Sequence, residues 1–176
     1  MEGILQVSEI YKSIQGESTY AGLPCVFVRL TGCSLRCSWC DTTHAFHGGS
    51  AMTIQQITQN ISTYNTSLIE ITGGEPLDQP EAIPLVKFLC DQGYDVLVET
   101  SGAIDITPLD SKAHIILDLK CPGSHMTSRM EWNNLMHLKP KDQVKFVILN
   151  RFDYEWALSI ISKYACLLYT SDAADE

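Results

Sequence analysis

The chain has 176 residues, of which 45% are hydrophobic and 19% charged, and its formal net charge is −9. This composition is typical of one globular domain with an apolar core, and it excludes a disordered chain. The acidic balance argues against binding to nucleic acid, which needs clustered Lys and Arg. Neither a membrane span nor a signal peptide is indicated, so we expect a cytoplasmic protein.

From Pro24 onward, short apolar runs alternate with helix-like stretches, which is the pattern of βα units on a parallel sheet. The predicted strands are residues 25–30, 67–72, 95–99, 114–120 and 143–149. The predicted helices are residues 53–64, 81–92, 129–137 and 153–163, with a short helical turn at 106–110. Thr53 is a capping residue for the first of them. These five units are too few to close an eight-stranded barrel.

The end of the chain differs in character from the rest. Residues 165–170 are apolar and β-prone and would supply a sixth strand, but the acidic residues after them stop without a helix or cap. Residues 166–176 read as the translation of a common transposase sequencing adapter. We therefore expect a core domain at 1–165 and a non-native tail at 166–176. The alternative is a genuine last strand with an acidic terminus.

Three of the seven cysteines lie within the segment CSLRCSWC, on a loop after the first predicted strand. Iron–sulfur clusters are normally held by four thiolates, so Cys33, Cys37 and Cys40 would leave one iron of a four-iron four-sulfur cluster open. S-adenosylmethionine can chelate such an iron and receive an electron there. The alternative is a structural zinc site with His44 or His47 as the fourth ligand, although zinc modules usually have paired ligand spacings.

The remaining cysteines are scattered, and an odd count in a cytoplasmic chain argues against a disulfide framework. Cys25 and Cys90 lie on apolar stretches. We expect both to be small buried hydrophobes.

The segment ITGGEP, at the end of the second predicted strand, is an independent signal. Backbone groups at the C-terminal edge of a parallel sheet face the ligand crevice, and Gly73 and Gly74 carry no side chain to block approach. A Gly-Gly pair alone indicates only a turn. Beside the cysteine triplet, it resembles the motif by which radical S-adenosylmethionine enzymes hold the amino group of their cofactor, with Glu75 orienting that amine.

Five segments together resemble the 7-carboxy-7-deazaguanine synthase family of radical S-adenosylmethionine enzymes: EIYKSIQGES, RLTGCSLRCSWCDT, ITGGEP, VETSG and DLKCPGS. The resemblance runs from about Glu9 to Lys163, and SIQGE and CDT are its most specific parts. It implies an α/β fold of the open partial (βα)6-barrel type, here with about five units and the last one missing or replaced. The family's C-terminal cofactor loop and closing segment have no counterpart in this chain.

The resemblance also implies three groups of site residues. The metal ligands are Cys33, Cys37 and Cys40 for the [4Fe-4S] cluster and Thr42 for Mg2+. The cofactor-binding residues are Trp39, Cys40, Asp41, Gly74, Asp118, Leu119 and Lys120. The substrate-binding residues are Ile14, Gln15, Gly16, Arg29 and Thr72. Arg29 would pair with the substrate carboxylate through its guanidinium fork. Glu17 lies beside the substrate-binding segment at Ile14, Gln15 and Gly16, and Glu99 is either a polar active-site residue or a partner of backbone amides.

The activity that the resemblance implies is a carbon–nitrogen lyase reaction of queuosine-type 7-deazapurine biosynthesis. It converts 6-carboxy-5,6,7,8-tetrahydropterin to 7-carboxy-7-deazaguanine with loss of ammonia, and Mg2+ positions the substrate carboxylate. The implied partners are the pterin, an electron donor such as flavodoxin and a second copy of the chain.

Two alternatives of other kinds stay open at this point. A glycyl-radical-enzyme activase shares the cluster motif and GGEP but acts on a polypeptide, whereas SIQGE and Arg29 favour a small carboxylate. A zinc-stabilised binding module without catalysis would be colourless, whereas an iron–sulfur protein is brown.

Overall fold

The structure of the chain is a computed structural model that describes residues 3–164 and 170–172. The strands are β1 (Ile4–Ile14), β2 (Pro24–Leu30), β3 (Ser50–Thr53), β4 (Leu68–Gly73), β5 (Asp95–Thr100), β6 (His114–Asp118), β7 (Gln143–Phe146) and β8 (Thr170–Asp172). The α-helices are α1 (Ile54–Ser62), α2 (Ala82–Asp91) and α3 (Arg151–Tyr164). Short 3-10 helices lie at Thr43–Phe46, Pro76–Asp78, Pro122–Ser124, Thr127–Arg129 and Trp132–Met136.

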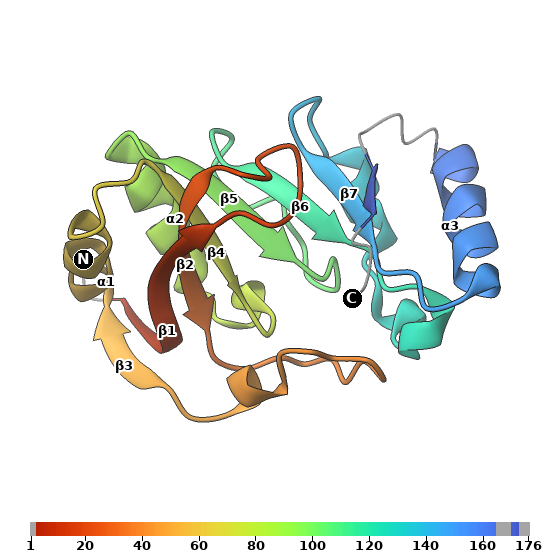
Figure 1. The fold of residues 1–176 in the computed structure, drawn as a ribbon, viewed down its shortest axis with the longest axis horizontal. Coiled ribbons are helices and arrows are strands. Elements are labelled where there is room, and N and C mark those ends of the chain that lie inside the picture. The colour runs from red at the N-terminus through yellow and green to blue at the C-terminus, as the bar shows by residue number, and fades with distance from the viewer. Residues whose placement is uncertain (1–2, 165–169, 173–176) are drawn as a thin grey trace.

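These strands form one sheet in the order β3-β1-β2-β4-β5-β6-β7-β8. The strands from β2 through β8 in this order are parallel to one another, while β1 runs antiparallel to both β2 and β3. Figure 1 shows α1 at one end of the curved sheet and α3 at the other. The fold class is therefore the expected one, an α/β partial barrel with an open sheet.

The two faces of the sheet carry separate apolar clusters. On the helix-covered face, residues such as Ile69, Ile71 and Val98 pack with Ile57 of α1 and Leu89 of α2 in one large core. The opposite, concave face has a small apolar floor formed by Cys25, Phe27, Leu68, Leu97 and Ile116. Because side chains of a strand alternate between faces, β2, β4, β5 and β6 each supply residues to both clusters.

The helix α1 begins as its sequence predicts. Thr53 is extended and its side chain accepts the backbone N–H of Gln56, while the Gln56 side chain reaches back to the Thr53 backbone. This reciprocal capping box satisfies two backbone donors that a helix start leaves unpaired. Ile54, Ile57 and Ile61 then lie buried on one face of the helix, as expected from their spacing.

All five predicted strands and the first, second and last predicted helices are confirmed, with shifts of a few residues at their ends. The turn predicted at 106–110 forms, with the N–H of Leu109 donating to the carbonyl of Ile106 at 3.0 Å, but its predicted helical form is wrong because no helix is present at these residues. There, Asp105 and Asp110 accept hydrogen bonds from the backbone N–H groups of Thr107 and Lys112, two residues further on, at 2.9 and 2.8 Å. Such side-chain bonds compete with helix formation.

The α-helix predicted at 129–137 is also wrong, since two 3-10 helices occupy this region. Between them Met130 is extended, with φ −70° and ψ 131°. The side chain of Asn134 accepts the N–H of Ile106 and donates to the carbonyls of Gly102 and Ile104. These tertiary hydrogen bonds hold the segment as two short 3-10 helices, although its sequence periodicity favours an α-helix.

Two strands were not anticipated, namely β1 and β3. Leu5 and Val7 are buried on one face at the start of β1, but from Ser8 onward the strand is partly or fully exposed on both faces, so its alternation fades. The predicted sixth strand at 165–170 lies outside the described residues apart from Thr170, the first residue of β8. The predicted tail at 166–176 likewise lies outside them except for β8, which pairs in parallel with β7.

Within the part of the chain that the structure describes, no helix is long and apolar enough to cross a bilayer.

Candidate active site

The concave face of the sheet leads into a pocket of about 600 Å³. This volume is within the range of small-molecule and cofactor sites. The C-terminal ends of β2, β4, β5, β6 and β7 line it together with the loop that follows β1 and the loop that follows β2. In an α/β sheet this edge is where ligands bind, because the backbone ends and the connecting loops meet there.

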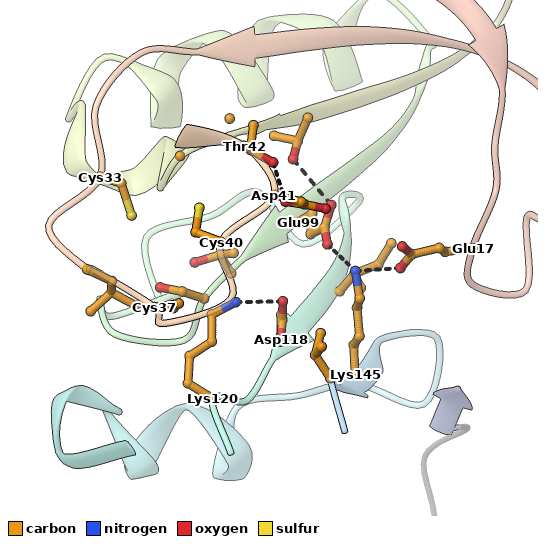
Figure 2. Close-up of a pocket in the computed structure, with 18 of the residues that line it drawn as sticks. Glu17, Cys33, Cys37, Cys40, Asp41, Thr42, Glu99, Asp118, Lys120 and Lys145 are labelled. Carbon is orange, nitrogen blue, oxygen red and sulfur yellow. Dashed lines mark hydrogen bonds and ion pairs between the residues drawn. The ribbon is translucent and has the colours of Figure 1, made fainter. Parts of the chain in front are cut away.

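The three clustered cysteines lie on the loop after β2, on one side of this pocket (Figure 2). Cys33, Cys37 and Cys40 are all free and half-buried. Burial raises the pKa of the Cys33 and Cys37 thiols, so a metal must displace a proton from each when it binds. The loop is anchored at its start, where Gly32 donates to the carbonyl of Ala45 at 2.7 Å and accepts from the N–H of Glu75 at 2.9 Å.

In the part of the chain that the structure describes, these thiols are not part of a ligand set for a single metal ion. Among residues 3–164 and 170–172, no three His, Cys, Asp or Glu side chains surround a position where one metal ion would bind. A zinc site with His44 or His47 needs such an arrangement. A cubane binds each thiolate at a different iron, so its three cysteines are spread around it.

The other two cysteines singled out in the sequence are buried, as expected. Cys25 is 0% exposed and Cys90 is 6% exposed. Burial raises the pKa of the Cys25 thiol to about 12, which keeps it neutral and unreactive. Neither residue lines the pocket.

The wall beside the cysteine loop is formed by the end of β6 and the residues that follow it. The Nζ of Lys120 pairs with Oδ2 of Asp118 at 2.7 Å and lies 5.2 Å from the ring centroid of Trp39. Burial opposes the charge on Lys120, but Asp118 outweighs it and the pKa of the amine is raised. Leu119 is 1% exposed and packs in the helix-side core, so its side chain does not reach the pocket.

Two buried polar atoms on these walls have no partner among the described residues, Oδ1 of Asp118 and Nε1 of Trp39. Buried polar groups are normally hydrogen-bonded, so an acceptor and a donor left free in a pocket indicate a missing ligand. Both residues are ones that the resemblance assigns to the cofactor. The walls therefore suit a polar cofactor beside the cysteines.

The end of β4 contains the ITGGEP segment, and its glycines have a different role from the expected one. A side chain on Gly74 would collide with the Gly32 carbonyl and with Cys33. The absence of a Cβ thus brings the β4 end against the cysteine loop, besides leaving its backbone open to a ligand. Gly73 and Gly74 both line the pocket, as does Thr72.

The structure gives Glu75 a structural role instead of the expected contact with the cofactor amine. Its side chain is fully buried and does not line the pocket. It accepts hydrogen bonds from the N–H of Leu77, from the hydroxyls of Thr100 and Ser101 and from the N–H of Ser101, at 2.5 to 2.9 Å. The carboxylate therefore fastens the end of β4 to the end of β5.

Arg29 lines the pocket from β2, and part of its guanidinium is already engaged. Its Nε donates to Oε1 of Glu9 at 2.8 Å and its Nη2 to the hydroxyl of Tyr11 at 3.2 Å. These bonds hold the fork in place at the cavity wall. A fixed guanidinium is well suited to a planar carboxylate.

Of the segment Ile14, Gln15 and Gly16, the last two line the pocket and Ile14 does not. Ile14 is 64% exposed and ends β1 opposite Pro24. Gln15 is 4% exposed, with its amide directed inward.

Thr42 and Asp41 lie at the pocket rim after the third cysteine. The Thr42 hydroxyl donates to Oδ1 of Asp41 at 2.6 Å (Figure 2). The pair presents a hydroxyl and a carboxylate to the cavity, and Mg2+ prefers oxygen ligands of these kinds.

The structure adds a charged group that the sequence analysis did not assign to the site. Lys145, on β7, places its Nζ 2.8 Å from Oε1 of Glu99 and 2.5 Å from Oε2 of Glu17 (Figure 2). The second oxygen of Glu99 accepts the hydroxyl of Thr72 at 3.2 Å. Burial opposes ionisation of Glu99, but Lys145 outweighs it and lowers the pKa to about 2. Glu99 therefore lies in the active site, the first of its two expected roles.

Glu70 is the second unanticipated residue, in the middle of β4. It is 3% exposed, lines the pocket and accepts the side-chain amide of Gln15. Glu70 and Lys145 are each flanked by buried residues in their strand. A charged residue is rare within a fully buried strand unless it is paired. The charged residues Glu70 and Lys145 within predicted buried strands were therefore the sequence signal that could have identified both as site residues.

Comparison with known proteins agrees with this geometry. The sequence model of the radical SAM superfamily matches residues 27–123. The crystal structure of QueE from Escherichia coli superposes with a TM-score of 0.78 over 98% of this chain and 95% of that one. Its sequence is 19% identical, so this likeness concerns the fold alone.

Curated relatives give a closer sequence match. The 7-carboxy-7-deazaguanine synthase of Koribacter versatilis is 46% identical over 155 residues, which cover 87% of this chain and 69% of the relative. That of Chlorobaculum tepidum is 41% identical over 169 residues, 94% of this chain and 77% of the relative. That of Thermoplasma acidophilum is 37% identical over 160 residues, 90% of this chain and 77% of the relative.

Proposed function

Because the chain belongs to the 7-carboxy-7-deazaguanine synthase family of the radical SAM superfamily, we propose that its pocket converts 6-carboxy-5,6,7,8-tetrahydropterin to 7-carboxy-7-deazaguanine with loss of ammonia. The observation that carries this proposal is that three free cysteines, the ITGGEP strand end and the Arg29 fork line the same cavity. An activase of a protein radical needs no such carboxylate-binding arginine beside its cluster.

The cofactors of a radical SAM enzyme are a [4Fe-4S] cluster and S-adenosylmethionine. Cys33, Cys37 and Cys40 would hold the cluster, and together with S-adenosylmethionine it supplies the radical that starts the reaction. The free atoms of Trp39 and Asp118 are available for hydrogen bonds to S-adenosylmethionine. Lys120, held over Trp39 by its ion pair with Asp118, fixes that wall.

The substrate would lie on the other side of the cavity, toward β2, β4 and β5. Arg29 suits the pterin carboxylate, since it lines the pocket and Glu9 and Tyr11 hold its fork in place there. Thr72 and Glu99 lie on adjacent strand ends and offer a hydroxyl and a carboxylate to the polar ring. The apolar floor, with Phe27 and Ile116, supports a flat ring from below.

The proposal also includes a Mg2+ ion, which is supported by two oxygen-bearing side chains alone. Thr42 and Asp41 present oxygen atoms at the rim, on the same loop as Cys40. Mg2+ usually keeps several waters and takes few protein ligands, so one or two oxygens suffice. A bound ion there would neutralise the carboxylate that Arg29 holds.

Flavodoxin or a similar one-electron donor, a second copy of the chain and a cytoplasmic location stay predictions. Light scattering under anaerobic conditions would test the dimer. Turnover with flavodoxin and its reductase would test the donor.

The first experiment is anaerobic reconstitution with iron and sulfide, followed by an assay for 7-carboxy-7-deazaguanine. The intact protein should turn brown, cleave S-adenosylmethionine and form the product. Cys37→Ala should lose the chromophore and all turnover, whereas Cys25→Ala, the matched control at a buried cysteine outside the pocket, should keep both. A full cluster in Cys37→Ala would contradict the ligand assignment, and a brown protein without product would contradict the substrate.

A further inference from the structure

Four polar contacts and one pair of neighbouring carboxyls form a closed ring in the wall of the pocket. The side-chain amide of Gln15 donates to Glu70, and its carbonyl oxygen accepts the N–H of Glu17 at 3.1 Å. The carboxylate of Glu17 pairs with Lys145, which pairs with Glu99 (Figure 2). Glu99 lies on β5 two residues beyond Leu97, the residue that faces Glu70 on β4, so the two carboxyls are neighbours on one face of the sheet and complete the ring. The ring joins β4, β5 and β7 to the segment after β1 that lines the substrate side.

The charges in this ring are not balanced if every carboxyl is ionised. Three carboxyl groups, those of Glu17, Glu70 and Glu99, then surround the single cation Lys145. Lys145 contacts Glu17 and Glu99 directly, while Glu70 has the neutral Gln15 amide as its hydrogen-bond partner and the carboxyl of Glu99 as its neighbour. Another titratable group that faces Glu70 is the neutral Cys25 thiol on β2. When two carboxyls are adjacent and only one of them is paired with a cation, the unpaired one keeps its proton more readily.

We propose that Glu70 is a positioning residue that stays a neutral carboxylic acid in the folded enzyme, donates its O–H to Glu99 and accepts the Gln15 amide, and thereby holds the substrate-contacting segment at Gln15–Glu17 in place. The proposal rests on the proposed function for its catalytic consequence, but the protonation state of Glu70 does not depend on that function. The geometry carries it: Glu70 is 3% exposed and has no cation within direct reach among the described residues.

The acceptor oxygen of Glu70 also fixes which way Gln15 points. With Glu70 present, the Gln15 Nε2 has an acceptor on β4 and its Oε1 has the Glu17 N–H, so the amide has one orientation. Without an acceptor at position 70, the amide loses its inner partner. Because the backbone N–H of Glu17 is hydrogen-bonded to the Gln15 side chain, Glu17 would then lose its position beside Lys145.

The proposal predicts the direction in which the stability of the protein changes with pH. Burial and then the neighbouring Glu99 raise the pKa of Glu70 well above its ordinary value of 4.5. A carboxyl with a raised pKa contributes its full stability below pH 4.5, and this is lost as the pH rises through the folded-state pKa, because the unfolded chain ionises more easily. A glutamine at this position does not titrate. The melting temperature of Glu70→Gln should therefore rise relative to that of the intact protein as the pH increases.

The experiment compares Glu70→Gln, Glu70→Leu and the exposed control Glu81→Gln in the full chain, after anaerobic reconstitution. Glutamine reproduces the neutral acid, with a carbonyl for Gln15 and an N–H for Glu99, so its KM should stay near that of the intact enzyme. Leucine removes both contacts, and KM for the pterin should rise roughly tenfold, equivalent to about 1.4 kcal/mol, with kcat, cluster content and cofactor cleavage without substrate little changed.

Two readouts need no turnover. The infrared carbonyl stretch of a protonated carboxyl should be present in the protein without substrate at neutral pH and be lost in Glu70→Gln but not in Glu81→Gln. The melting-temperature difference between Glu70→Gln and the intact protein should grow with pH, while Glu81→Gln shows no such trend. Absence of the band, or a Glu70→Gln variant as impaired as Glu70→Leu, would overturn the inference. Absence of the deazaguanine product with the band present would overturn the proposed function alone.

Discussion

The helix-covered face and the concave face of the sheet are built from alternate residues of the same strands, yet they are stabilised in different ways. On β4, Ile69 and Ile71 are 0% exposed under the helices, and Glu70 and Thr72, facing the pocket, are only 3% and 6% exposed. The exposed fraction of a residue therefore does not distinguish the apolar core from the site. The difference lies in pairing: apolar side chains need only close packing, whereas each buried polar group needs a specific partner.

The apolar face should tolerate change without effect on the chemistry, and the largest loss of stability tests this. Leu89, on α2, is 0% exposed within the helix-side core. Leu89→Ala should lower the free energy of unfolding by about 2–5 kcal/mol, because it leaves a cavity in close-packed surroundings. Denaturant melts would measure this loss. KM and cluster content, assayed below the melting temperature, should stay unchanged, and a raised KM would show that the two faces are coupled.

The polar face should respond in the opposite manner, with stability and activity lost together. Lys145→Ala removes the cation shared by Glu99 and Glu17. Breaking a buried pair costs about 3–5 kcal/mol, and we expect the lower end, about 3 kcal/mol, because solvent screens Glu17, whose side chain is 40% exposed. Turnover should fall as well.

Lys87→Ala is the matched control for that variant, since Lys87 also lies between two carboxylates, Asp91 and Asp110, but on the surface. It should change neither the melting temperature nor the activity noticeably. If both lysine variants behaved alike, the pairing argument for the concave face would fail.

The smallest expected effect concerns the shape of one group rather than its charge. Arg29→Lys keeps the cation but loses the fork that Glu9 and Tyr11 orient. KM for the pterin should rise roughly tenfold while cluster content and melting temperature stay normal. Steady-state kinetics of the reconstituted enzyme would measure it. An unchanged KM would remove Arg29 from the substrate site.

The sequence predicted the elements that depend on local patterns. The apolar runs of the parallel strands, the Thr53 cap and the periodic isoleucines of α1 are all confirmed. The helix predicted at 129–137 was wrong, and the turn predicted at 106–110 forms without becoming helical, because the side chains of Asp105, Asp110 and Asn134 bind backbone groups near and far in the sequence. Propensity and periodicity do not register such competition.

The sequence by itself determined which residues lie together within one short motif. CxxxCxxC places three thiols on one loop, and ITGGEP marks the end of a strand. Residues only a few positions apart cannot lie far from one another in space, so their spacing constrains where their side chains lie. What only the tertiary structure decided is which distant residues meet. Glu17, Glu70, Glu99 and Lys145 come from four separate parts of the chain. Glu70, Glu99 and Lys145 meet because β4, β5, β6 and β7 pair in parallel and in register, and the loop after β1 brings Glu17 to Lys145. The tertiary structure also decided the role of Glu75, because four hydrogen-bond donors surround its carboxylate. Glu75 therefore links the ends of β4 and β5 instead of making the expected contact with the cofactor.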